Sequence, residues 1–322
     1  MNRGIAALVA AALLAACEPA PEEPVEPPEA APETEIQVDE ADRQALADAW
    51  QEEATPALRR LRAASEGFHD LVGALLNDPA EQRLETARAA WHELYGHWNR
   101  AMVVLAARDL DADRERFLRV DPLPILPGYV DGLAAWPESG LIHDPTIALE
   151  RETLLEQQEL TAAGEITTGF QVIHFLLFGE PERERTAAEF DAGDDNGEAS
   201  LAKQRRRQYL AVTTELLRQD LEALARQEDD APSATALLAG LDFAMERHGE
   251  LEALEGATDP AEGLYLAADA RATAREPLFA AVNYWLSGDG HAPLTRVLEQ
   301  TDAEAAALAS EHGEDWTKQE GM

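Results

Sequence analysis

Apolar residues recur at steps of three and four along most of the chain after residue 40, which is the spacing of amphipathic α-helices. Proline, glycine and Asn-Asp-Pro turns separate these periodic stretches. The predicted helices span roughly residues 40–76, 80–108, 145–163, 167–178, 199–227, 233–255, 260–286 and 293–311. No alternating strand pattern is found, so we expect an all-α fold of two packed helical bundles.

The stretch from 167 to 179, TTGFQVIHFLLFG, differs from the other helices because it carries no charge. It is apolar over most of its circumference, which predicts a buried helix. Gln171 and His174 are three residues apart and are expected to share one face. Polar groups inside a bundle need a hydrogen bond, a water or a metal, and the pattern leaves these alternatives open.

The chain divides into a leader, a tether and two helical parts. Residues 17–39 are dominated by proline and glutamate, which predicts an extended, self-repelling tether. The acidic, glycine-containing loop DAGDDNG at 191–197 is the best boundary between an N-terminal bundle at 40–195 and a C-terminal bundle at 196–322. The irregular stretch at 109–145 is long enough to suggest a functional loop.

Acidic side chains outnumber basic ones by 63 to 26, and the formal net charge is −37 at pH 7. A field of this sign repels nucleic acid and anionic lipid surfaces, so we expect no nucleic-acid partner. The same field attracts cations. Composition alone leaves two uses for this acidity open, adaptation to salty surroundings and capture of cations.

The N-terminus has the pattern of a bacterial lipoprotein signal. Arg3 precedes an apolar run at 5–16, which is too short to span a bilayer and is typical of a signal peptide over residues 1–16. The run ends in LAAC, which resembles the lipobox, so Cys17 is expected to receive lipid and to anchor the chain. Cys17 is the only cysteine, and no internal disulfide can form. By resemblance to lipoprotein sorting signals, Glu18 favours the outer membrane, facing the periplasm.

The stretch HELYGH at 92–97 is one residue longer than the HExxH zinc motif. Five helical residues turn the second histidine about 140° from the first, so His92 and His97 cannot hold one metal from a regular helix. Glu93 and His97 are four apart, and they are either two ligands of a site or a plain surface pair. His143-Asp144 is the other place where two ligand-capable residues meet. No nucleophile motif, Walker loop or dinucleotide fingerprint is present.

Four stretches together resemble the imelysin family. GFQVIHFLLFG at 169–179 is similar to the family's Gly-x-His-x-x-Glu helix, which an apolar run and a glycine follow. ARAAW at 87–91, AWPESGLIHD at 135–144 and RRRQYL at 205–210 resemble three further family segments in the right order. Imelysins are bacterial envelope proteins, often lipoproteins, once described as peptidases and tied to iron uptake. The resemblance covers most of the chain after the tether and implies the same all-α fold.

The resemblance implies a metal site on the motif helix, but the two polar positions are changed. Gln171 stands where the family has histidine, and His174 stands where it has glutamate. The site is therefore either lost or rebuilt around His174 and Gln171, with partners from facing positions: Glu93, His97 and Asp144. Imidazoles and carboxylates together suit iron, copper or zinc, as a divalent or ferric ion.

Three functions follow from these expectations and stay open. The first is a metal-binding or iron-uptake-associated envelope lipoprotein, with an envelope transport or partner protein. The second is an interaction lipoprotein whose ancestral metal site is lost. The third is a metal-dependent peptidase, against which the altered motif weighs, because metal hydrolysis needs both a held ion and a carboxylate base.

Overall fold

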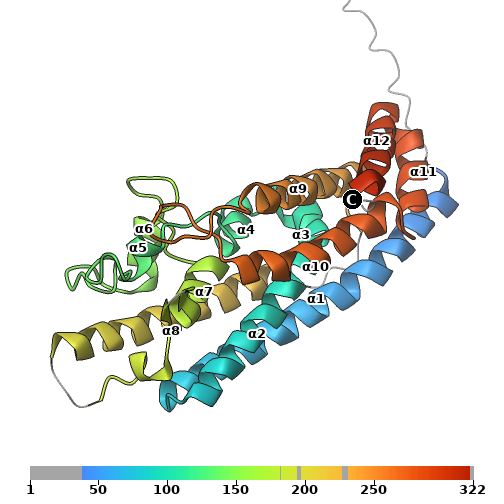
Figure 1. The fold of residues 1–322 in the computed structure, drawn as a ribbon. Helices are drawn as coiled ribbons and strands as arrows, with labels where there is room; N and C mark the ends of the chain where they lie inside the picture. The colour runs from blue at the N-terminus through green and yellow to red at the C-terminus, as the bar shows by residue number, and fades with distance from the viewer. Residues whose placement is uncertain (1–37, 182, 194–196, 227–230, 320–322) are drawn as a thin grey trace, which may run out of the picture. The chain divides into compact units, whose positions relative to one another are not determined.

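The computed structural model describes residues 38–319, except residues 182, 194–196 and 227–230. This part of the chain contains twelve α-helices and one two-stranded hairpin, so the predicted all-α fold is confirmed (Figure 1). The signal peptide, Cys17 and the tether up to residue 37 lie outside the described residues. No described helix has the length and hydropathy that crossing a bilayer requires.

The helices lie in chain order as follows. They are α1 (Glu40–Asn77), α2 (Glu81–Arg100), α3 (Met102–Asp109), α4 (Arg114–Val120), α5 (Pro127–Val130), α6 (Arg151–Gln157), α7 (Phe170–Phe178), α8 (Glu198–Leu224), α9 (Ala234–Ala253), α10 (Ala268–Leu286), α11 (His291–Thr301) and α12 (Ala303–Gln319). The strands β1 (Gly179–Glu180) and β2 (Arg183–Glu184) pair antiparallel directly after α7.

The longest helix, α1, shows why the periodic pattern was a good guide. The Asp39 carboxylate accepts a hydrogen bond from the backbone N–H of Ala41 at 2.8 Å and caps the first turn. Acidic side chains in that turn favour the positive end of the helix dipole. The apolar residues at three- and four-residue steps in this helix are buried, with the part-exposed Leu71 as the exception: Leu46, Trp50, Leu58, Leu61, Phe68, Val72 and Leu75.

Several expected elements differ from the structure. The helix expected at 260–286 begins only at Ala268, and the helix expected at 293–311 is two helices, α11 and α12, separated at Asp302. The stretch expected to be irregular at 109–145 contains the short helices α4 and α5. The helix expected at 80–108 is interrupted at Ala101, where ψ is −1°, and becomes α2 and α3. The helix expected at 145–163 is reduced to α6. It does not continue toward residue 163, because Glu159 adopts a left-handed φ of 51° that a regular helix does not allow. The hairpin β1–β2 was not expected, since strands of two residues are too short to show an alternating pattern.

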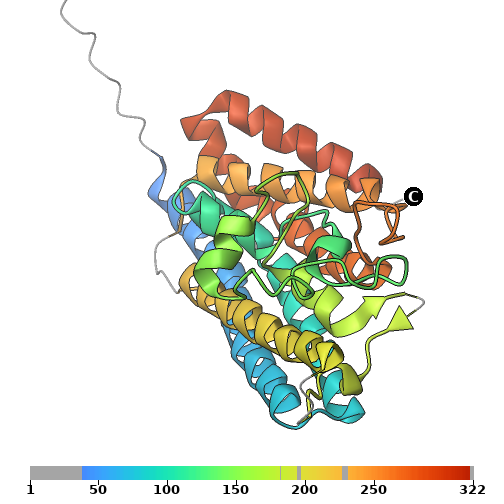
Figure 2. The same cartoon turned by 90° about the vertical axis from the view of Figure 1, so that its left-hand side faces the viewer.

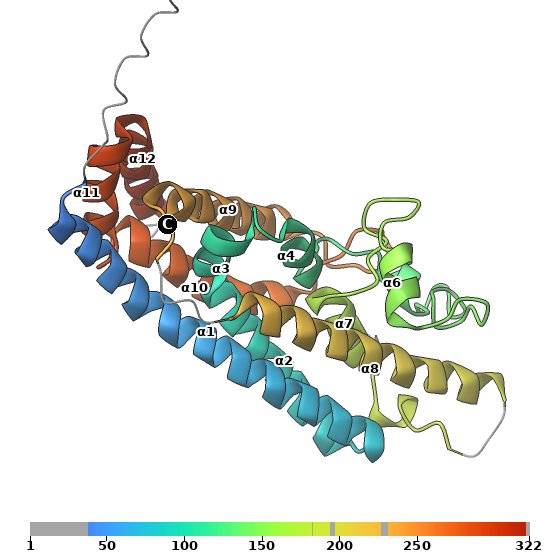
Figure 3. The same ribbon diagram turned by 180° about the vertical axis from the view of Figure 1, so that it is seen from behind.

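Helices from both halves of the chain pack on one another. α10 lies against α2 and α9, and α1 lies against α2, α8 and α11. Figure 3 shows α1 and α8 side by side. α3 approaches α9 so closely that a Cβ at Gly240 would lie 2.7 Å from the backbone of Val103 and Ala107. The predicted boundary between the two bundles, between residues 195 and 196, falls within the undescribed residues 194–196 and remains a prediction.

Candidate functional site

Two glycines set the bounds of the motif helix α7. Gly169 precedes it with a φ of 94°, and a Cβ there would lie 2.7 Å from the carbonyl oxygens of Arg119 and Val120. Gly179 follows it with a φ of 77°, and a Cβ there would lie 2.9 Å from the carbonyl oxygen of Arg183 in the hairpin. Neither position accepts a side chain without strain, so these glycines fix where α7 begins and where it turns into the hairpin of Figure 2.

Gln171 belongs to a closed hydrogen-bond network in the core. Its side-chain amide donates to Tyr95 Oη at 3.0 Å and to Asp121 Oδ1 at 2.9 Å. Tyr95 Oη donates to Asp121 Oδ2 at 3.0 Å, and Arg247 pairs with the same carboxylate at 2.6 Å. Burial raises the pKa of Tyr95 well above its ordinary value, with Asp121 as the next cause. Gln171 therefore acts as a hydrogen-bond donor in a buried ion-pair network.

Arg247 is the buried cation of this network. Burial alone would lower the pKa of its guanidinium, but the Asp121 carboxylate beside it raises that pKa above the ordinary value. The amide of Gln171 gives Asp121 a further donor without adding a second charge. An amide fits this position because the network already contains one cation and one anion.

His174 faces a different neighbour, the Asp269 carboxylate at the start of α10. Its Nε2 lies 3.1 Å from both carboxylate oxygens of Asp269. The imidazole stacks on Phe178 with ring centroids 4.1 Å apart and meets Trp91 edge-on at 4.7 Å. These contacts leave His174 only 3% exposed and fix its ring in one orientation.

Asp269 is ionised, and this sets the protonation of His174. Burial would raise the pKa of Asp269, but the hydrogen bond from His174 and the nearby His92 hold it below its usual range. The first turn of α10 also favours a negative charge at this position. An ionised carboxylate only accepts hydrogen bonds, so His174 carries its proton on Nε2 and donates it to Asp269.

His92 on α2 approaches the same carboxylate from the other side. Its Nε2 lies 3.5 Å from Asp269 Oδ2, and its Nδ1 lies 2.8 Å from Thr273 Oγ1. The Thr273 hydroxyl donates its single proton to the backbone oxygen of Asp269 at 2.8 Å. With that donor direction Thr273 accepts from Nδ1–H of His92, and we assign His92 this tautomer, in which the Nε2 of the neutral ring carries a lone pair.

In this assigned tautomer two acceptors face each other across 3.5 Å, the Nε2 lone pair of His92 and the carboxylate of Asp269. Burial lowers the pKa of His92, and the attraction of Asp269 offsets only part of that effect. His92 is therefore neutral at neutral pH. A pair of facing acceptors is repulsive unless a cation or a proton lies between them.

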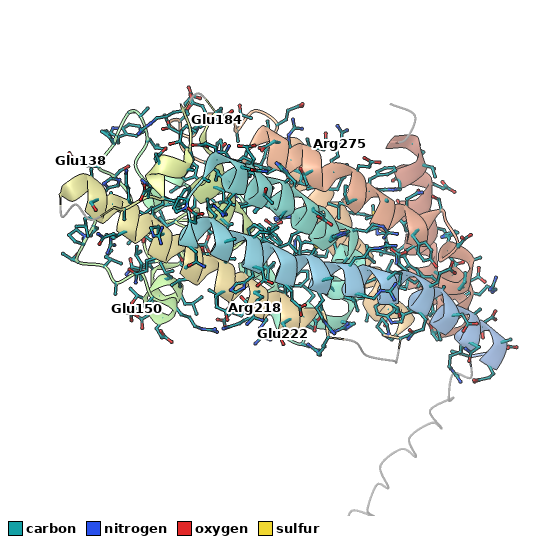
Figure 4. The ribbon with its side chains drawn as sticks, turned by 90° about the horizontal axis from the view of Figure 1, so that it is seen from below. Glu138, Glu150, Glu184, Arg218, Glu222 and Arg275 are labelled. Atoms are coloured by element: carbon teal, nitrogen blue, oxygen red, sulfur yellow. The ribbon has the colours of Figure 1, made fainter. Side chains whose placement is uncertain are left out.

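This acceptor pair lies in a pocket of about 600 Å³, which we call the His174 pocket; its lining includes His92, His174 and Asp269. Glu180 and Glu184 of the hairpin line it as well, and Glu184 is labelled in Figure 4. Burial raises the pKa of Tyr265, another lining residue, and the charges of Asp269 and Glu180 raise it further. The electrostatic potential in the pocket is therefore negative.

One cationic side chain, that of Arg88, also lines the His174 pocket, but it already has hydrogen-bond and ion-pair partners. The guanidinium of Arg88 donates to the backbone oxygens of Leu177 and Arg185 and pairs with Glu85. It also lies over the Phe178 ring, 5.2 Å from the centroid. Arg88 thus fastens the end of α7 to α2 and leaves the acceptor pair without an internal counter-ion.

Gln171 and His174 do not form one site, although they share a short helix. Three residues of helix separate their directions by about 60°, and α7 is buried on all sides. Gln171 meets the network of Tyr95 and Asp121, whereas His174 meets Asp269. The expectation that both would contribute to a single metal site is not met by this geometry.

The other expected ligands lie away from the His174 pocket. Glu93 and His97 form an i,i+4 pair on α2 with a separation of 3.9 Å, and neither lines the pocket. Asp144 closes a turn by accepting from the backbone and the hydroxyl of Thr146 at 2.9 Å and 2.6 Å. The five expected ligands are therefore not brought together in one site. Glu93 and His97 match the alternative that they form a plain pair on the helix surface.

His143 contributes to a buried ion cluster under the irregular segment. Its Nε2 lies 3.4 Å from the carboxylate of Asp131, which also pairs with Arg185 at 2.8 Å and Arg206 at 2.7 Å. Burial would raise the pKa of Asp131, but His143 and the two guanidinium groups hold it below the usual range. This cluster ties the segment at 127–147 to the hairpin and to α8, which is a structural role.

Sequence reasoning missed His92, Asp269 and Thr273. For the last two only the spacing gave a signal, because Asp269 and Thr273 are four residues apart inside the helix expected at 260–286. Nothing in the pattern indicated that this turn would meet α2 and α7. Among the described residues no group of three or more His, Cys, Asp or Glu side chains is arranged to hold a metal ion, so the acceptor pair is a two-residue arrangement.

Comparisons with known proteins agree with the fold. The imelysin family model matches residues 54–307. A crystal structure of an imelysin-like protein from Psychrobacter arcticum 273-4 is similar to this chain, with a TM-score of 0.50 and 15% sequence identity, over 87% of this chain and 84% of that chain. At this identity the likeness shows the fold alone. Among curated proteins no match was found.

Proposed function

Because the chain belongs to the imelysin family, we propose that it is a lipid-anchored envelope protein that binds a metal cation, divalent or ferric, as exchangeable cargo. The proposed site is the acceptor pair of His92 and Asp269 in the His174 pocket. His174 is a positioning residue there, since its proton is committed to Asp269. Anchoring through Cys17 and a role beside an envelope transport protein are parts of the same proposal.

The observation that carries the proposal is the close approach of His92 Nε2 to the Asp269 carboxylate. His92 Nε2 and Asp269 Oδ2 are 3.5 Å apart, and in the assigned tautomer of His92 neither atom carries a proton. Two ligands of one tetrahedral metal ion, each at about 2.1 Å, lie about 3.4 Å apart. The pair therefore has the spacing of two metal ligands before any movement, and its negative surroundings favour a cation.

A site with two protein ligands suits cargo better than a permanent cofactor. Structural metal sites use four protein ligands and catalytic zinc sites three, so a two-ligand site leaves most of the coordination sphere to water or to a carrier. Such an ion exchanges readily. The same feature argues against a metallopeptidase, which needs a firmly held ion and a carboxylate base beside its water.

The test is calorimetric titration of the purified full-length protein with ferric, copper and zinc ions. We expect about one ion per chain, and we expect His92→Ala and Asp269→Asn each to weaken binding by about tenfold or more, as loss of one ligand does. Asn can still accept from His174, so Asp269→Asn removes the charge and keeps the shape. His97→Ala is the matched control, because it removes an imidazole from the same helix outside the pocket.

Three outcomes would overturn the proposal. Weak binding at many sites, unchanged in His92→Ala, would mean that only the acidic surface attracts metal. Preference for an alkylammonium ion over every metal tested would assign the pocket to an organic cation. Peptide cleavage that chelators abolish would replace cargo binding with catalysis.

A further inference from the structure

A second pocket, of about 890 Å³, lies between α9 and α10 and shares no lining residue with the His174 pocket. α9 contributes His248 and Glu252, which are four residues apart and therefore on one face. α10 contributes Arg271, Arg275 and Phe279 at the same spacing. Two antiparallel stripes of functional side chains thus face one cavity, whose size is in the range of about 300–1,000 Å³ usual for ligand pockets.

Charges of both signs line this pocket, and their present partners hold them weakly. Arg275 Nε lies 3.0 Å from Glu252 Oε1, and Arg271 Nη2 lies 3.4 Å from Glu255 Oε1. The side chains of Arg275 and Glu255 are 58% and 72% exposed, so water screens both pairs. The Nε of Arg271 is buried without a hydrogen-bond acceptor among the described residues.

The third component of the pocket is aromatic. Phe279 stacks on Trp316 with centroids 4.9 Å apart, and His248 meets Trp316 edge-on at 5.2 Å. Burial lowers the pKa of His248, so at neutral pH it adds a neutral ring and no third positive charge. The wall beside the charges therefore suits an apolar or aromatic group.

We propose that this pocket binds a free amino acid with a large apolar side chain. The guanidinium groups of Arg271 and Arg275 take the carboxylate, Glu252 and the neighbouring Glu276 take the ammonium group, and Phe279 contacts the side chain. A carboxylate is the natural partner of paired guanidinium groups, and the ammonium group of the ligand replaces Arg275 at Glu252. Glu255, whose side chain is 72% exposed, gives up Arg271 to the ligand and is solvated by water.

The overall charge of the chain favours a zwitterion over a simple anion. With a formal net charge of −37, the protein repels a free anion at long range, and Glu252 and Glu276 would repel it again inside the pocket. A simple cation would meet the two arginines. A ligand with one charge of each sign and no net charge avoids both costs.

The test is calorimetric titration of the full-length protein with L-phenylalanine, L-phenylalaninamide and N-acetyl-L-phenylalanine. The amide lacks the carboxylate and the acetyl compound lacks the ammonium group, so we expect each to bind about tenfold more weakly than the amino acid. We expect Arg275→Gln and Glu252→Gln to weaken phenylalanine binding similarly. Arg275 is mostly exposed, so its replacement leaves the core intact.

Arg218→Gln is the matched control, because Figure 4 places Arg218 on α8, away from Arg275 on α10. Phenylalanine binding that both pocket variants lose and the control keeps would support the site. Binding of the amide as strong as that of the amino acid would overturn it, and so would binding that Arg275→Gln leaves unchanged. Absence of any binding at millimolar concentrations would overturn it as well.

Discussion

Replacing His174 by glutamate tests the account of the altered motif most directly. The substitution returns to position 174 the residue type of the imelysin pattern, but in this chain it removes the donor that faces Asp269. A glutamate carboxylate would meet both Asp269 oxygens, which now lie 3.1 Å from the imidazole nitrogen. Position 174 is 3% exposed, so the new carboxylate would be largely removed from water.

The size of the effect follows from these distances. Two unit charges 3.1 Å apart repel by about 5 kcal/mol at an effective dielectric constant of about 20. Water screens part of this repulsion, because the Asp269 side chain is 47% exposed. With the lost hydrogen bond included, we expect a destabilisation of about 3 kcal/mol, which lowers the melting temperature by about 6 °C in a chain of this size.

The destabilisation caused by His174→Glu should depend on pH. Paired carboxyl groups hold one proton more tightly, so the shared pKa in the folded protein is raised above the unfolded value. The destabilisation is therefore full at about pH 7.5 and shrinks toward about pH 5, as the pair takes up its proton. His174→Gln is the control, because an amide still donates to Asp269 without adding charge.

Thermal melting of the two variants at both pH values is the assay. Equal melting temperatures for His174→Glu and His174→Gln at both pH values would refute the assigned donor role of His174. A second readout is zinc. The new carboxylate would supply a third ligand beside the acceptor pair, so we expect zinc to raise the melting temperature of His174→Glu more than that of the wild type.

Three further predictions concern the buried Asp131 cluster, the acceptor pair and the Gln171 network. Asp131→Ala should lower the free energy of unfolding, measured with urea at neutral pH, by about 3–5 kcal/mol, because two buried guanidinium groups lose their shared carboxylate. Since the pKa of Asp131 is lowered in the folded protein, this loss of stability should be full above about pH 4 and should shrink below it. Metal affinity by calorimetry should be constant above about pH 6.5 and fall at lower pH as protons occupy His92, and an unchanged affinity at about pH 5 would contradict its role. Gln171→Glu should destabilise more than Gln171→Leu in thermal melts, because it places a second carboxylate against Asp121.

The helical pattern predicted most of the fold because apolar spacing and turn residues act locally. The long helices α1, α8 and α9 lie close to their predicted ranges. The errors fall where a contact from elsewhere in the chain decides the backbone. Ala101 has an ordinary helical sequence context, and its turn separates α2 from α3, which packs closely on Gly240 of α9.

The site was harder to predict, because ligand spacing along one helix does not say which flank meets which neighbour. On α2 the buried residues centre on Trp91 and Tyr95. His92 points about 80° to one side of that centre, and His97 points about 140° to the other side. The helical periodicity therefore correctly placed the two histidines on different flanks of α2, but it could not indicate which of them belongs to the site. His92 lies on the flank that meets α7 and α10, close to Asp269, whereas His97 lies on the flank near Arg60 of α1. The choice between a site residue and a surface residue was made by tertiary packing alone.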